Sequence, residues 1–218
     1  MKPVDAADYT IAVIGAGAMG QGIAQVAVQG GVKTLLYDAK PGGADAGREQ
    51  IMKRINRLVE KGRISEEDAK AAGDRLGTVD QVSALAPCDA VVEAVFESLE
   101  VKADVFKQVE AVVSDDCIIA SNTSSIPIAS LAQACEKRDR VAGMHFFNPV
   151  PLMKLVEDIR ASDTSYETVA ALTQLGSRMT RVPVTVADMP GFLVNMGGRA
   201  FSSEALRIVH EGVATPAQ

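Results

Sequence analysis

Tryptophan is absent from the 218-residue sequence, and aromatic residues make up only 4% of it. The hydrophobic core must therefore be built from alanine, valine, isoleucine and leucine. Hydrophobic residues amount to 47% and charged residues to 23%, which is ordinary for a globular protein and excludes disorder over most of the chain. At about 150 residues per domain, the length lies between one domain and two.

Cysteine, basic charge and long apolar runs are also scarce, and each scarcity excludes a class of protein. Cys88, Cys117 and Cys135 are odd in number and widely spaced. They predict neither a disulfide framework nor a metal site, and we expect a cytoplasmic protein. The net charge of −6 argues against nucleic acid or an anionic membrane surface as the main partner. No apolar run approaches the roughly 18 residues of a membrane helix, and Met1–Tyr9 lacks the apolar region of a secretory signal.

Short apolar runs alternate with helical patterns along most of the chain. This alternation predicts an α/β fold, with a doubly wound, mostly parallel sheet and helices on both of its faces. The expected strands are 10–14, 32–37, 77–79, 90–96, 117–120, 140–146, 154–159 and 181–186. The expected helices are 18–29, 44–61, a short helix capped by Ser65, 98–113, 165–179 and 192–210.

A glycine-rich turn follows the first expected strand and opens the first expected helix. Gly15, Gly17 and Gly20 form a G-x-G-x-x-G pattern, with Ala18 and Met19 inside it. Gly15 permits the tight turn, Gly17 lets the backbone approach a pyrophosphate, and Gly20 lets helix and strand pack closely. The free N–H groups of the helix N-terminus favour such an anion. The pattern predicts a Rossmann-type dinucleotide site.

Two further features extend this cofactor site. Asp38 ends the second expected strand, 23 residues after Gly15, near the spacing of the acid that binds the adenine ribose. A carboxylate there repels a 2′-phosphate, so NAD is favoured over NADP; a structural turn with a solvated Asp38 is the alternative. Glu97, at the carboxyl end of the strand 90–96, and Lys102 could line the cofactor or form a surface ion pair.

The chain has only two histidines, and they occupy different kinds of position. His210 lies near the end of the last expected helix, where it suits the helix dipole, and we interpret it as structural. His145 lies at the carboxyl edge of the sheet, where an imidazole can move a proton near neutral pH. A hydrogen-bonded core histidine is the alternative. The segment 121–125 follows the preceding strand, and Glu157 lies on the next one, so a base, a hydroxyl and an orienting acid are expected side by side.

Five short motifs are spread over the chain. They are GAGAMG at 15–20, VVEA at 91–94, SNTSS at 121–125, HFFNP at 145–149 and PGFLVN at 190–195. With these motifs, essentially the whole chain resembles the N-terminal part of the L-3-hydroxyacyl-CoA dehydrogenase family, which includes 3-hydroxybutyryl-CoA dehydrogenases. The resemblance implies NAD as cofactor, an acyl-CoA as substrate, and a homodimer in the full-length enzyme. The implied reaction oxidises the 3-hydroxyl to a 3-oxo group.

The resemblance also implies roles for single residues. His145 is implied to remove the 3-hydroxyl proton, with Glu157 orienting and stabilising its imidazole. Ser124 is implied to bind the substrate oxygen near the nicotinamide, Asn195 to place the reacting oxygen, and Asn148 to lie at the substrate edge. No G-x-S-x-G elbow surrounds the serine, which excludes a hydrolase nucleophile. The implied NAD contacts are the glycine turn, Ser124, Asp38, Glu97 and Lys102.

Basic residues gather on the second expected helix despite the acidic balance of the chain. Lys53, Arg57 and Lys61 follow each other at intervals of four residues and share one face, with Arg54 and Arg63 nearby. Composition alone favours a solvated face. The resemblance instead implies that this helix contacts the CoA nucleotide through Arg54 and Lys61.

The resemblance explains why the length lies between one domain and two. We expect residues 1–190 to form the NAD-binding domain, and residues 191–218 to be the first helix of a C-terminal helical domain that is otherwise missing. We expect this helix to pair with another copy or to fold back on the sheet. The leading hypothesis is a 3-hydroxyacyl-CoA dehydrogenase with impaired activity. The alternatives are an NAD-binding module without catalysis, and a dehydrogenase of a CoA-free β-hydroxy acid.

Overall fold

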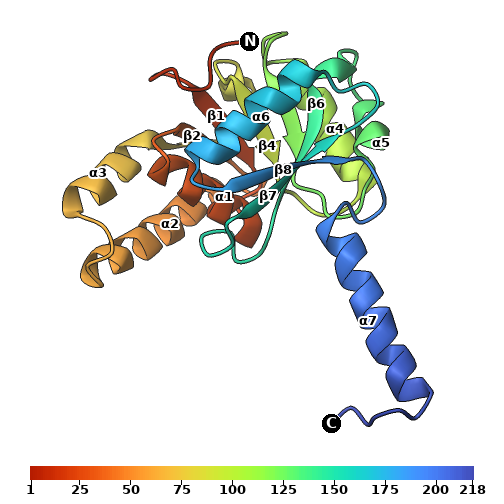
Figure 1. The fold of residues 1–218 in the computed structure, drawn as a ribbon. Coiled ribbons are helices and arrows are strands. Elements are labelled where there is room, and N and C mark those ends of the chain that lie inside the picture. Colours follow the sequence, from red (N-terminus) through yellow and green to blue (C-terminus); the bar gives the residue numbers. More distant parts are fainter.

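A single eight-stranded sheet runs through the computed structural model, which describes all 218 residues (Figure 1). The strands are β1 (Thr10–Ile14), β2 (Lys33–Tyr37), β3 (Leu76–Val79), β4 (Ala90–Glu93), β5 (Ile118–Ser121), β6 (Val141–Phe146), β7 (Leu155–Arg160) and β8 (Val182–Ala187). Their order is β3-β2-β1-β4-β5-β6-β7-β8, and only the pair β6 and β7 is antiparallel. This is a Rossmann-type doubly wound sheet, so the predicted fold class is confirmed.

Seven α-helices accompany the sheet. They are α1 (Ala18–Gln29), α2 (Gly43–Glu60), α3 (Glu66–Arg75), α4 (Leu99–Glu110), α5 (Ile128–Ala132), α6 (Tyr166–Arg178) and α7 (Val194–His210), with 3-10 turns at Val82–Leu85 and Arg138–Arg140. The predicted cap of α3 is confirmed: the Ser65 hydroxyl accepts the N–H of Asp68, 3.0 Å away. The sequence did not predict α5, because five residues are too few to show a helical period.

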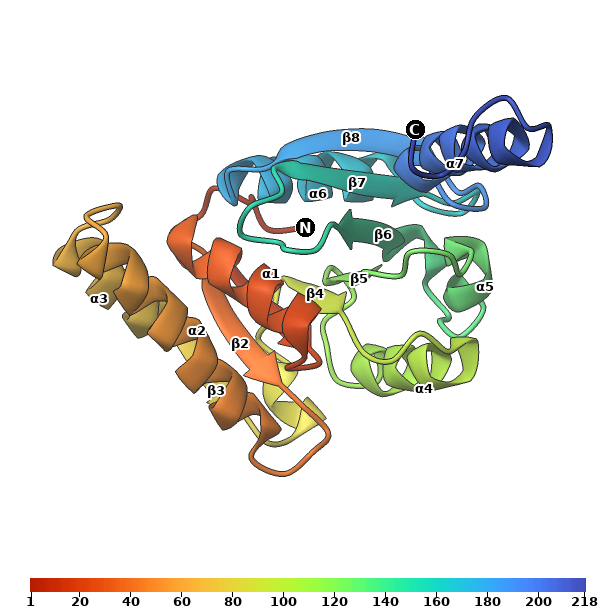
Figure 2. The ribbon, with the colours of Figure 1, turned by 90° about the horizontal axis from the view of Figure 1, so that it is seen from below.

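Two apolar cores lie on the two faces of the sheet. Figure 2 shows the helices that cover these faces. Helices α1, α2, α3 and α6 cover one face, where Ile23, Ile51 and Leu172 are fully buried. Helices α4 and α5 cover the other face with Phe106 and Leu131. Since both faces are covered, the central strands are apolar throughout and the polar side chains collect at the strand ends.

The fourth strand is shorter than the sequence predicted. The apolar run predicts a strand over 90–96, whereas β4 ends at Glu93. The backbone N–H of Val95 donates to Oε1 of Glu93 at 2.6 Å, so the chain turns around this carboxylate instead of continuing the strand. Glu97 therefore lies in the loop after the sheet edge, not directly at the strand end.

Helix α7 projects away from the body of the molecule, and the C-terminus lies at its far end (Figure 1). None of its residues is buried, and Phe201 is 81% exposed. The expectation that this helix folds back on the sheet was wrong, because the turn at Gly191 and Phe192, with φ of 83° and 48°, directs it outward. Pairing with another copy stays a prediction. None of the helices is both long enough and apolar enough to cross a bilayer.

Candidate active site

The glycine turn lies at the carboxyl end of β1, against the exit of the neighbouring strand β4. Gly15 has a φ of 99°, and a Cβ there would lie 2.6 Å from the carbonyl oxygen of Ala94. A Cβ on Gly20 would lie 1.7 Å from the carbonyl oxygen of Gly15. A Cβ on Gly17 would meet nothing within 4 Å, so this position faces open space. The geometry matches a turn that closes on itself and leaves room for a phosphate.

The N-terminus of α1 begins directly after this turn, at Ala18 and Met19. Its N-cap, Gly17, supplies no side-chain hydrogen bond, and the first turn of the helix contains no acidic residue. The first N–H groups are therefore free to bind an anion, which is favoured there by the helix dipole. The local geometry fits the pyrophosphate of a dinucleotide.

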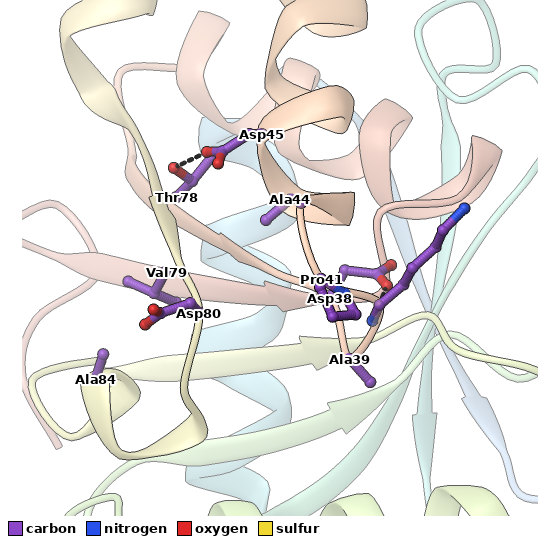
Figure 3. Close-up of a pocket in the computed structure, with 11 residues that line it drawn as sticks. Asp38, Ala39, Pro41, Ala44, Asp45, Thr78, Val79, Asp80 and Ala84 are labelled. Atoms are coloured by element: carbon purple, nitrogen blue, oxygen red, sulfur yellow. Dashed lines mark hydrogen bonds between the residues drawn. The ribbon is translucent and has the colours of Figure 1, made fainter.

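Asp38 connects the glycine turn to a cavity of about 730 Å³ beside β2 and β3 (Figure 3). Its Oδ2 accepts the N–H of Ala16 at 2.6 Å, and its Oδ1 accepts the N–H of Lys40 at 2.8 Å. Asp45 and Asp80, which no sequence pattern predicted for the site, line the same cavity, and Lys40 is its only cation. Three carboxylates against one ammonium make the cavity unfavourable for a 2′-phosphate.

His145 and Glu157 lie directly opposite each other on the antiparallel strands β6 and β7. Nδ1 of His145 is 2.7 Å from Oε2 of Glu157, and both side chains are buried. Because the carboxylate accepts a hydrogen from Nδ1, the other ring nitrogen, Nε2, carries the free lone pair. The ring centroids of Phe147 and Phe192 lie 4.5 and 5.7 Å from that of His145. The imidazole of His145 is thus bound to Glu157 and packs against the rings of Phe147 and Phe192.

The second oxygen of Glu157 holds the start of α7. Oε1 accepts the backbone N–H groups of Leu193 and Val194, both at 2.9 Å. These N–H groups lie at the start of the helix, where backbone donors have no partner within the helix. The side chain of Glu157 therefore contacts both His145 and the start of α7.

Ser124 lies in the exposed loop that follows β5, near both Asn195 and the end of β6. The side-chain amide of Asn195 donates to the carbonyl oxygen of Ser124 at 3.4 Å, which brings α7 to this loop. Asn122, which the sequence analysis did not single out, accepts the N–H of Phe146 at 2.8 Å and so ties the loop to the strand of His145. Asn148 lines the basic cavity described below.

Lys102 is only 1% exposed and lies between two carboxylates. Its Nζ is 2.7 Å from Oε1 of Glu93 and 3.1 Å from Oε2 of Glu97, so it belongs to a buried network and not to a surface ion pair. Oε1 of Glu97 accepts the hydroxyl of Thr123 at 2.6 Å and the N–H of Ser124 at 3.0 Å. Burial alone would raise the pKa of Glu97, but these hydrogen bonds and the charge of Lys102 outweigh it and lower the pKa.

Glu93 anchors the network, although no sequence pattern predicted a role for it. Its Oε2 accepts the hydroxyl of Ser121, directly opposite on β5, at 2.7 Å. The available signal was a carboxylate that ends an otherwise apolar buried run. A buried carboxylate needs a partner of opposite charge. That this partner is Lys102 depends on how α4 packs against the sheet, which the sequence does not show.

Basic residues line a second cavity, of about 790 Å³, between α1, α2 and the loop after β6. Its charged residues are Arg54, Arg57, Lys61, Arg63 and Arg181. None of these five makes a salt bridge, so the cavity carries uncompensated positive charge in an acidic protein. Lys53, predicted to share their face, does not line the cavity.

Two of these arginines are fixed by neutral oxygens. Arg54 donates to the side-chain oxygens of Gln25 and Gln21 at 2.8 and 3.0 Å, and its Nη2 is buried without a partner. Arg181, which sequence reasoning missed, donates to the carbonyl oxygens of Val150 and Met153 at 3.1 and 2.8 Å. Burial lowers the pKa of both guanidinium groups. The cavity is therefore pre-formed for an anion.

The family model described as "3-hydroxyacyl-CoA dehydrogenase, NAD binding domain" matches residues 10–189. The chain belongs to this family. The predicted resemblance is confirmed, and so is NAD as the cofactor. The match spans the glycine turn, the buried Lys102 network and the His145–Glu157 pair, and it ends just before the turn at Gly191.

Relatives within the family are similar over nearly the whole chain. A probable 3-hydroxybutyryl-CoA dehydrogenase of Deinococcus radiodurans is 43% identical, over 94% of this chain and 73% of its own. One of Bacillus subtilis is 40% identical, over 94% and 72%. The crystal structure of (S)-3-hydroxybutyryl-CoA dehydrogenase from Ralstonia eutropha superposes with a TM-score of 0.92 at 38% identity, covering 95% of this chain and 74% of that one.

Proposed function

We propose that this protein oxidises the 3-hydroxyl group of a 3-hydroxyacyl-CoA to a 3-oxo group, and carries out the reverse reduction, with NAD. The observation that carries the proposal is the buried His145–Glu157 pair, at the same carboxyl edge of the parallel strands as the glycine turn of an NAD-binding domain. NAD supplies the hydride acceptor and donor. The remaining requirements are a base for the hydroxyl proton, a group that places the oxygen, and a site for the CoA nucleotide.

The base in this proposal is Nε2 of His145. Glu157 accepts the hydrogen of Nδ1 at 2.7 Å, which leaves the lone pair of Nε2 available for the 3-hydroxyl proton. After the proton has moved, the same carboxylate stabilises the imidazolium. Phe147 and Phe192 flank the ring and limit the water that can compete for the proton.

Ser124 and Asn195 are the proposed groups that place the substrate oxygen. The 3.4 Å contact between the Asn195 amide and the Ser124 carbonyl brings both side chains to one place at the end of β5. A hydroxyl and an amide can donate hydrogen bonds to the 3-oxygen while its C–H bond faces the cofactor. Asn195 comes from α7, so the position of this helix affects the site.

The basic cavity is the proposed site for the phosphates of CoA. Arg54 and Lys61 line it, as the family resemblance implies, together with Arg57, Arg63 and Arg181. Guanidinium groups without a carboxylate partner are suited to bind phosphate oxygens. Asn148 lines the same cavity and is proposed to contact the substrate between the nucleotide and the acyl group.

The test is the consumption of NADH with acetoacetyl-CoA, followed by absorbance. We expect turnover, and we expect His145→Gln to reduce it by roughly 100- to 10,000-fold while NADH binding persists. His210→Gln is the matched control, because this histidine lies on the exposed helix α7, and it should leave the rate unchanged. An unchanged rate in His145→Gln would contradict the assigned base.

Two alternatives predict other results in the same assay. An NAD-binding module without catalysis would bind NADH, measured by its fluorescence, and show no turnover in the wild-type chain. A dehydrogenase of a CoA-free acid would reduce free acetoacetate at a rate at least equal to that for acetoacetyl-CoA. The five uncompensated cations of the second cavity favour the CoA ester over the free acid.

A further inference from the structure

Three charged side chains at the end of β4 carry one negative charge that no partner cancels. Glu93 and Glu97 are two carboxylates, and Lys102 is the single cation within 4 Å of either. Glu93 is fully buried and Lys102 is 1% exposed, whereas Glu97 is 39% exposed, so water screens the charge of this cluster only in part. The fixed hydrogen bonds of Glu93 to Val95 and Ser121 hold the cluster in one arrangement.

The cluster lies between the glycine turn and the loop of Ser124. On one side, the exit of β4 touches the turn, because a Cβ on Gly15 would lie 2.6 Å from the Ala94 oxygen. On the other side, Glu97 binds the N–H of Ser124 at 3.0 Å. The carboxyl ends of β1 and β4 form the crevice where a doubly wound sheet binds its dinucleotide. The uncancelled charge therefore lies at this crevice, on the side of Ser124.

We propose that this cluster makes the site favour oxidised over reduced NAD, and that Glu93 is the positioning residue that maintains it. The nicotinamide ring carries one positive charge when oxidised and none when reduced. A fixed negative charge lowers the free energy of the first form and not of the second. Lys102 neutralises the charge of Glu93. Its second contact, with Glu97, holds that carboxylate next to the backbone of Ser124. The inference rests on the proposed function only in placing the nicotinamide beside Ser124.

The test compares the dissociation constants of NAD⁺ and NADH, measured by calorimetry without any acyl-CoA. Glu93→Gln keeps the size of the side chain and removes the net charge. We expect the ratio Kd(NAD⁺)/Kd(NADH) to rise roughly three- to tenfold. Glu110→Gln is the matched control: this carboxylate pairs with Arg140 at 3.1 Å, away from the cofactor edge, and its loss should leave the ratio unchanged.

Two further variants separate charge from structure. Glu97→Gln removes the same unit charge from a side chain that is 39% exposed, so it serves where Glu93→Gln does not fold, and it should raise the ratio as well. Ser121→Ala removes a neutral hydrogen bond to Glu93 and keeps the charge. It should change both dissociation constants by a similar factor and leave their ratio constant.

The outcomes are distinguishable from those of the proposed function. A ratio that does not move in Glu93→Gln and Glu97→Gln, or one that moves equally in Ser121→Ala, overturns the inference and leaves the dehydrogenase assignment intact. A ratio that rises as expected in a protein without turnover on acetoacetyl-CoA overturns the proposed function and supports the inference.

Discussion

His145 and Glu157 face each other across the only antiparallel strand pair of the sheet, with Nδ1 of the imidazole 2.7 Å from Oε2 of the carboxylate. The other oxygen of Glu157 accepts two backbone N–H groups at the start of α7. The proposed base and the projecting helix are therefore connected through one side chain. A change at Glu157 should reach both.

Glu157→Gln should reduce turnover on acetoacetyl-CoA by at least about 100-fold, because an amide cannot stabilise the imidazolium. It should also loosen the start of α7, seen as faster hydrogen exchange at Leu193 and Val194. Asp158→Asn is the matched control, since this neighbouring carboxylate contacts neither His145 nor α7. Normal exchange at the start of α7 in Glu157→Gln would show that the two contacts are independent.

Asp38→Asn should weaken the preference for NADH over NADPH. The carboxylate lies at the entrance of a cavity with three acids and one cation, so removing one negative charge lowers the repulsion of a 2′-phosphate. We expect the ratio of the two dissociation constants to shift by roughly tenfold. Asp74→Asn, on the exposed surface of α3, should leave the ratio unchanged. A constant ratio in Asp38→Asn would assign Asp38 to the turn alone.

Lys61→Glu should raise the KM for acetoacetyl-CoA by roughly tenfold, with the KM for NADH unchanged. The reversed charge lies in the basic cavity, where phosphates are proposed to bind. Lys53→Glu makes the same change earlier in the chain, within α2 and outside the cavity, and should have little effect. The difference between the variants should shrink at high salt, because partly exposed charges are screened. Equal effects of both variants would indicate general electrostatics instead of a site.

Asp158 makes a prediction about stability. Burial raises the pKa of this carboxyl from 3.8 to about 7, against a lowering by the hydrogen bond from Thr173, and its Oδ1 is buried without a partner. Between about pH 4 and pH 7 the folded protein therefore holds a proton that the unfolded chain has lost. The free energy of unfolding should fall as the pH rises through this window and then level off.

Asp158→Asn should remove this dependence. The free energy of unfolding of the variant minus that of the wild type should grow from pH 4 to pH 7, by up to roughly 4 kcal/mol, measured by urea denaturation. Asp104→Asn, an exposed carboxylate on α4, should show a constant difference. A flat difference for Asp158→Asn would mean that its carboxyl is ionised in the folded protein throughout this range.

Local patterns explain why much of the fold could be predicted. Apolar runs and helical periods predict strands and helices because each element forms among residues that are close in the sequence. The glycine turn is predictable because a side chain at Gly15 or Gly20 would clash with the backbone. The predicted end of β4 was wrong, and α5 was not predicted at all. Strand β4 ends early because the side chain of Glu93 accepts a hydrogen bond from the backbone N–H of Val95. In α5, five residues are too short for a period to show.

The sequence by itself determined the Rossmann-type fold, the glycine turn with Asp38, and the residue types of the proposed site. The tertiary structure alone decided that Lys102 is buried between Glu93 and Glu97, that Arg181 joins the basic cavity and Lys53 does not, and that α7 points outward. The physical reason is range. Local backbone preferences act over a few residues, whereas ion partners and cavity walls depend on strand register and helix return, which bring together groups far apart in the chain.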